Sequence, residues 1–136
     1  MNVKDVMQTQ FVRIQADDKF GSILKTFAKN HITSAPVFDK GEYIGVISIS
    51  GVVSYFTPPG FLFLWRKKEP TPTKKLEKVI AANLVKKPKT VLRPEQMLHS
   101  VLKKIASEAD CIPVIDKKGK MVGIVRDEDM LKFFLT

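Results

Sequence analysis

Two stretches of the chain carry apolar residues at the three- and four-residue spacing of an amphipathic helix. The first stretch has Phe20, Ile23, Leu24, Phe27 and Ala28, and the second has Met97, Leu98, Val101, Leu102, Ile105 and Ala106. Because this spacing places side chains on one face of an α-helix, both stretches are predicted to be helices that pack against a core.

Short apolar runs on either side of each predicted helix are typical of strands. Each helix follows an extended piece (11–14 or 90–92) and precedes a strand (36–38 or 113–115), a turn (39–41 or 116–119), a second strand (43–47 or 121–125) and a final apolar helix. The turns contain Asp, Lys and Gly, which favour chain reversal. The strands are uniformly apolar, so helices are expected to cover them. The predicted order is β-α-β-β-α, twice.

The two halves of the chain are copies of one unit. SAPVFDKG at 34–41 is matched by CIPVIDKKG at 111–119, and YIGVI at 43–47 by MVGIV at 121–125, at an offset of 78 residues that slips by one only around the Pro-Val strand. Two copies of about 55 residues favour a closed pair over a solenoid, which needs more repeats. The predicted fold is α/β, of the α+β kind. Repeat 1 spans 1–57, a linker 58–78 and repeat 2 79–136.

Composition is that of a chain able to build a hydrophobic core. The 136 residues are 44% hydrophobic, enough for a compact domain. The single cysteine, Cys111, lies in an apolar run, which favours a core position and a reducing, cytoplasmic location without internal disulfides. The first ten residues include Asp5 and no apolar stretch, so no signal peptide is expected. No run approaches the roughly 20 apolar residues of a membrane span.

The positive charge is concentrated in one region. Residues 66–89 hold nine Lys or Arg against Glu69 and Glu77, which gives +7 of the net +9. Such an excess favours anionic partners. The alternative is a solvated linker that lysines keep soluble. Nucleic-acid binding ranks low because these basic residues are not interleaved with the aromatic side chains on which bases stack.

Five large apolar residues interrupt the linker. Phe61, Leu62, Phe63, Leu64 and Trp65 follow two prolines and a glycine and precede basic residues. Exposed, they would promote aggregation, so they are expected to pack on the chain itself or on a dimer mate. The alternatives are a docking surface for a partner protein and a weak membrane-surface contact that the lysines assist.

The duplicated pattern resembles a cystathionine-β-synthase (CBS) domain, and the tandem pair resembles a Bateman module, over residues 3–56 and 79–135. The resemblance implies a pseudo-two-fold pair of repeats with clefts between them, a stand-alone regulatory protein and a homodimer. Family members often bind AMP, ADP, ATP or S-adenosylmethionine and report occupancy to a partner, while some bind nothing.

The resemblance also implies a ligand motif, Gly-hydrophobic-x-Thr/Ser-x-x-Asp, where the last strand meets the last helix. Copy one, GVISISG at 45–51, keeps Ser48 but has Gly51 in place of the acid; copy two, GIVRDED at 123–129, keeps Asp129 but has Arg126 in place of the hydroxyl. A carboxylate can accept two hydrogen bonds from a ribose diol, and an arginine can bind phosphate bidentately. A nucleotide site is therefore expected in copy two.

Other ligand contacts are implied by position in the family pattern. In copy two they are Lys89, Thr90, Cys111, Ile112 and Pro113, and in copy one Val12, Ser34, Ala35 and Pro36. For Pro36 and Pro113 the alternative role is entry into a strand. A structural interpretation of GIVRDED makes Asp127 the N-cap of the last helix, with Glu128 and Asp129 in its first turn.

No pattern of catalytic residues is found in the sequence. It lacks a glycine-rich phosphate loop, and His31 and His99 stand apart without metal-ligand spacing. We therefore expect no enzymatic activity, no required cofactor and no metal. Two function classes stay open: a ligand sensor acting on an unknown regulated protein, and a ligand-free interaction or dimerisation module that uses residues 61–65.

Overall fold

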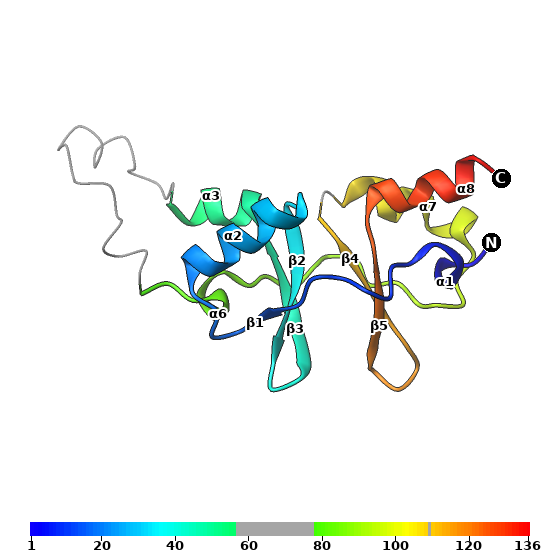
Figure 1. Ribbon diagram of the computed structural model, residues 1–136. Coiled ribbons are helices and arrows are strands. Elements are labelled where there is room, and N and C mark those ends of the chain that lie inside the picture. Colours follow the sequence, from blue (N-terminus) through cyan, green and yellow to red (C-terminus); the bar gives the residue numbers. More distant parts are fainter. Residues whose placement is uncertain (57–77, 109) are drawn as a thin grey trace. The chain divides into compact units, whose positions relative to one another are not determined.

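A computed structural model of the chain describes residues 1–56, 78–108 and 110–136 (Figure 1). The chain forms two compact units. We call Ile14–Lys86 the middle unit, and Met1–Arg13 together with Lys87–Thr136 the terminal unit. Each contains a small sheet and its own helices, as expected from the duplication.

The middle unit contains a three-stranded sheet in the order β1-β2-β3. Strand β1 (Ile14–Gln15) runs parallel to β2 (Ser34–Asp39), and β2 is antiparallel to β3 (Glu42–Ser48). Lys40 and Gly41 have positive φ angles of 50° and 85° at the β2–β3 turn, a conformation typical of tight hairpins. Its helices within the described residues are α2 (Phe20–Asn30), α3 (Ile49–Phe56) and α6 (Ala81–Leu84).

The terminal unit repeats this plan with a two-stranded sheet. Strands β4 (Ile112–Ile115) and β5 (Met121–Val125) are antiparallel. The predicted extended piece at 90–92 is reduced to a single parallel bridge between Leu92 and Val114. The helices are α1 (Val3–Val6), α7 (Leu98–Ser107), the 3₁₀ helix η1 (Asp127–Met130) and α8 (Leu131–Phe134). The α+β prediction with two repeats is confirmed.

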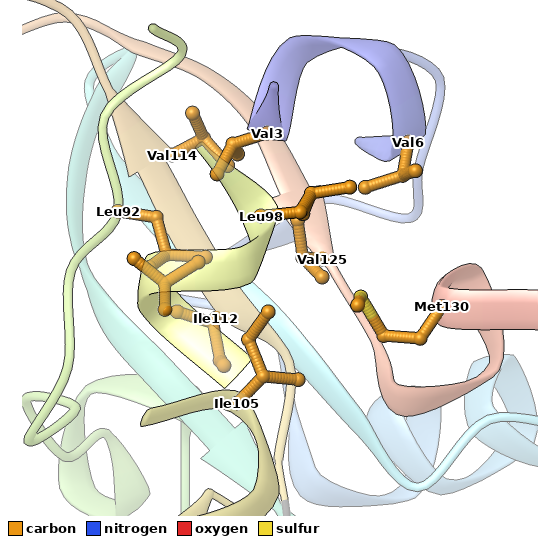
Figure 2. Packing of buried hydrophobic residues seen from close by; sticks show 10 residues of the cluster. Val3, Val6, Leu92, Leu98, Ile105, Ile112, Val114, Val125 and Met130 are labelled. Atoms are coloured by element: carbon orange, nitrogen blue, oxygen red, sulfur yellow. The ribbon is translucent and has the colours of Figure 1, made fainter. Parts of the chain in front are cut away.

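Apolar residues from almost every element of the terminal unit meet in one core (Figure 2). Its buried members are Val3, Val6, Leu92, Leu98, Val101, Ile105, Ile112, Val114, Val125 and Met130. Helix α7 contributes three of them at the predicted helical spacing. Met97 was also expected on this face, but its side chain is 63% exposed because it is the N-cap residue, before the helix begins.

Buried and exposed positions agree with most of the remaining expectations. Cys111 is 1% exposed and belongs to the core. In α2, Phe20, Ile23 and Phe27 are buried, whereas Leu24 is exposed at the edge of the apolar stripe. His31 ends α2 in the left-handed region, with φ 54°. In the described part of the chain no helix has the length and apolar character needed to cross a bilayer.

The short helix that begins each repeat packs in the unit formed by the other repeat. Helix α1 precedes β1 in sequence, yet it lies in the terminal unit with β5 and α7 (Figure 1), and α6 lies in the middle unit. Gln8 pairs with Ile124 through two backbone hydrogen bonds of 2.8 and 3.0 Å, and Lys86 pairs with Val46 through bonds of 2.9 and 2.8 Å. The repeats therefore exchange their first segments: residues 1–13 of repeat 1 belong to the terminal unit, and residues 79–86 of repeat 2 belong to the middle unit.

Two glycines permit this exchange. A Cβ on Gly123 would lie 2.8 Å from both the Gln8 carbonyl oxygen and the Met7 sulfur, and one on Gly45 would lie 2.7 Å from the Lys86 carbonyl oxygen. Both positions lack room for any side chain, and Gly45 also has a φ of 152°. Close approach of the exchanged segment thus explains why both copies of the motif begin with glycine.

Candidate functional site

The candidate site of copy two is built on the turn between β5 and η1. Arg126 has the extended backbone of an N-cap, with φ −109° and ψ 161°. Its N–H donates a 2.7 Å hydrogen bond to Oδ2 of Asp129, and the Asp129 N–H donates a 3.0 Å bond to the Arg126 carbonyl. This reciprocal arrangement satisfies the N–H groups of both residues and the Arg126 carbonyl, and it fixes the Asp129 carboxylate at the end of the strand.

The prediction that Asp127 is the N-cap is wrong. Asp127 is the first residue of η1, and its exposed Oδ1 accepts a 2.8 Å hydrogen bond from the adjacent Glu128 N–H. The cap position falls to Arg126 because this residue still has strand-like dihedral angles, and the carboxylate three residues on closes the turn. Asp129 lies in the first turn, as expected, and its carboxylate accepts the hydrogen bond that closes the turn.

Gln8 completes the surroundings of Asp129. Its Nε2 donates hydrogen bonds of 3.0 Å to Oδ1 and 3.0 Å to Oδ2, and both side chains are half-buried. Equal distances place the nitrogen between the two carboxylate oxygens. Gln8 comes from the exchanged segment, 121 residues away in sequence. Sequence reasoning missed it, although it matches Lys86 at the same 78-residue offset that relates the repeats.

The equivalent turn of copy one is closed from its opposite end. Ser48 Oγ accepts a 3.0 Å hydrogen bond from the Gly51 N–H and makes a 3.1 Å hydrogen bond with Ser50 Oγ. A Cβ on Gly51 would lie 3.2 Å from Ser48 Oγ and 3.9 Å from Cε of Lys86. Hydroxyls and a lysine stem therefore lie where copy two has a carboxylate and an amide.

Each copy thus retains one half of a capping arrangement. Copy one has a hydroxyl at the cap and no acid, and copy two has an acid and no hydroxyl. Either half alone closes the turn. The structure therefore tolerates Gly51 in place of the motif's acid and Arg126 in place of the motif's hydroxyl. The chemistry left over differs: only copy two presents a carboxylate at this turn.

The other predicted residues divide between the two units. The terminal unit holds Val12, Lys89, Thr90, Cys111, Ile112, Pro113, Arg126 and Asp129, and the middle unit holds Ser34, Ala35, Pro36 and Ser48. Val12 was assigned to copy one but lies in the unit that contains copy two, because it belongs to the exchanged part of the chain.

Burial limits how these residues could act. The side chains of Cys111, Ile112, Ala35 and Ser34 are at most 1% exposed. The Pro113 carbonyl accepts a 3.0 Å hydrogen bond from Leu92. Lys89 is exposed and Thr90 is half-buried.

Residues 61–65, the predicted apolar interface, lie outside the described residues. Across the described ranges no three His, Cys, Asp or Glu side chains gather in a way that could hold a metal ion.

Comparison with known proteins identifies the repeated unit. A family model described as "CBS domain" matches residues 3–57 and 81–136. The uncharacterized protein MJ1004 of Methanocaldococcus jannaschii is 25% identical over 132 residues, covering 97% of this chain; the chain spans 56% of that relative's length.

Solved structures of CBS proteins share the fold. A CBS domain-containing protein of unknown function from Bacillus anthracis superposes with a TM-score of 0.79 at 20% identity, covering 99% of this chain and 93% of its own. CBSX2, a CBS-pair protein of Arabidopsis thaliana, in complex with AMP gives a TM-score of 0.74 at 19% identity, covering 98% and 96%. With the family model spanning most of its length, the chain belongs to the CBS-domain family and carries two CBS domains in tandem.

Proposed function

We propose that this protein is a regulatory module that binds an adenosine-containing ligand, such as AMP, ADP, ATP or S-adenosylmethionine, and signals its occupancy to a partner. The observation that carries the proposal is the Asp129 carboxylate, fixed and half-buried at the end of β5 in a CBS fold. The AMP complex of a protein with the same fold supports the ligand class.

The chemistry of the turn suits a ribose. An ionised carboxylate accepts hydrogen bonds only, and two vicinal hydroxyl groups can each donate to one of its oxygens. Arg126 is three residues away on the same turn and supplies a cation for a phosphate. Lys89 and Thr90 belong to the same unit, and at the positions that the family pattern implies they would add a second cation and a hydroxyl. Neither a cofactor nor a catalytic step is needed for this role.

Copy one is proposed to contribute differently. Gly51 supplies no acceptor for a ribose, so Ser48, Ser34, Ala35 and Pro36 would contact a ligand without diol recognition. The buried positions among them can offer only backbone groups. We therefore assign the discriminating interaction to copy two.

Calorimetry on nucleotide-stripped protein tests the proposal. AMP, ATP and S-adenosylmethionine are titrated separately, and at least one is expected to bind. Asp129→Ala is expected to weaken binding at least tenfold, since it removes charged hydrogen bonds. Asp127→Ala is the matched control, because Asp127 is exposed and its carboxylate bonds only to Glu128 in the described structure. No heat and no thermal shift with any of the three ligands would refute the ligand class.

A second candidate function, protein interaction, is favoured by the surface of the last helix. Leu131, Phe134 and Leu135 are 61%, 66% and 83% exposed. Adjacent large apolar side chains at this exposure are characteristic of interaction surfaces. In this role α8 would contact another protein or a second copy of the chain, and ligand binding would be dispensable.

A further inference from the structure

The Gln8 side chain occupies the part of Asp129 that a ribose would use. Its Nε2 is 3.0 Å from each carboxylate oxygen, so it lies on the face where two donors bind a carboxylate together. A vicinal diol needs the same face, because its two hydroxyls donate to the two oxygens. Oδ2 also accepts a hydrogen bond from the Arg126 N–H, which belongs to the backbone turn.

We propose that Gln8 is an internal competitor for the Asp129 site, displaced when an adenosine-containing ligand binds, and that it couples occupancy to the N-terminal segment. This inference rests on the proposed function. It assigns to Gln8 the regulation of the site: the amide holds the carboxylate in the empty protein and lowers the apparent affinity for ribose.

The N-terminal segment is placed to respond to this displacement. The Gln8 backbone makes two hydrogen bonds with Ile124, and α1, immediately before it, buries Val3 and Val6 in the core. Releasing the Gln8 side chain breaks the side-chain hydrogen bonds between this segment and Asp129 of η1, while the backbone pairing and the core contacts remain. The ligand therefore acts on a segment that the sequence assigns to the other repeat.

Copy one provides an internal comparison. Lys86 has the same backbone pairing as Gln8, but the position facing it is Gly51, which has no carboxylate. A substitution of Lys86 therefore alters the equivalent place in the exchanged segment without touching the Asp129 site.

Calorimetry with AMP, ATP and S-adenosylmethionine tests the proposal on the full chain. Gln8→Met keeps the length of the side chain and removes its donors, and it is expected to lower the Kd about tenfold, the effect of one hydrogen bond to a charged group. Gln8→Ala is expected to act in the same direction, and Lys86→Met to leave the Kd unchanged. A Kd that is unchanged or raised in both Gln8 variants overturns the proposal while the ligand function stands. Absence of binding in wild type and in both variants overturns the ligand function and this proposal together.

Nuclear magnetic resonance gives a readout that a purely structural role would not move. The side-chain amide signal of Gln8 is assigned by its absence in Gln8→Met. Saturating ligand is expected to shift this signal toward that of a solvated amide. A Gln8 signal that is unchanged at saturation overturns the displacement.

Discussion

The carbonyl oxygen of Gln8 lies 2.8 Å from the point where a Cβ on Gly123 would stand. The same relationship joins Lys86 to Gly45, at 2.7 Å. In both units a backbone segment from the other repeat rests directly on a strand glycine. The glycine of the family motif therefore has a packing role in this protein, separate from any contact with a ligand.

Replacing Gly123 with alanine is expected to lower the free energy of unfolding by about 2–3 kcal/mol, because the Gln8 backbone must move to admit a methyl group. Urea denaturation followed by circular dichroism measures this. Gly21→Ala is the control: Gly21 lies within α2 with nothing within 4 Å of a Cβ, and alanine there should stabilise by about 0.5–1 kcal/mol. Equal stability of Gly123→Ala and wild type would contradict the close approach.

The two turns should respond to substitution at different positions. Ser48→Ala removes the hydroxyl that accepts from Gly51 and is expected to cost about 1 kcal/mol of stability, as other N-cap losses do. Arg126→Ala, at the equivalent position, leaves the cap in place because the Asp129 carboxylate supplies it. Thermal unfolding should show Ser48→Ala melting below wild type. A larger loss in Arg126→Ala would mean that its side chain, and not the carboxylate, supports the turn.

Adjacent residues at the start of α7 provide a test of the core. Leu98 is fully buried and Met97 is 63% exposed. Leu98→Ala is expected to cost about 2–5 kcal/mol, since it leaves a cavity in the cluster of Figure 2, whereas Met97→Ala should change stability by less than about 0.5 kcal/mol. Denaturant midpoints measure both. Similar losses of stability in the two variants would mean that α7 presents a different face to the core.

The exposed face of α8 predicts association. A double substitution, Leu131→Ser with Phe134→Ser, is expected to shift the mass measured by light scattering toward the monomer, while the melting temperature stays within a few degrees, because these side chains are exposed in the single chain. Lys132→Ser, on the same helix, is the matched control. An unchanged mass in the double variant would show that α8 does not form the interface.

Hydrophobic spacing predicted the long helix and the hairpin of each repeat, but not the short helices α1 and α6 or the reduction of 90–92 to a single bridge. Helices around Ile23 and Val101, and hairpins around Gly41 and Gly119, occur where the pattern places them, because period and turn chemistry are local properties. The exchange of first segments is not local. It depends on contacts such as that of Gln8 with Ile124, two residues more than a hundred positions apart in the sequence. The sequence feature that marks the exchange is the glycine at 45 and 123, and this glycine fitted the ligand motif equally well.

The sequence proposed candidate site residues but not the hydrogen bonds that connect them. Asp129 was selected because the family motif names it, and Gln8 was absent because no local pattern links it to the turn. The choice of Asp127 as the cap failed for a related reason: three consecutive acids can all fill a first turn, and only the backbone angles of Arg126 decide which one closes it.

The exchanged segments have a consequence for dividing the chain. Cutting at the linker would give two fragments, each lacking the strand-edge segment that its hairpin pairs with: β5 without Met7 and Gln8, and β3 without Val85 and Lys86. Each fragment would carry the missing piece of the other. We expect such halves to be poorly folded when expressed singly and to reconstitute each other when mixed, so that the break between the sequence repeats is a site for fragment complementation and not a boundary between independent folding units.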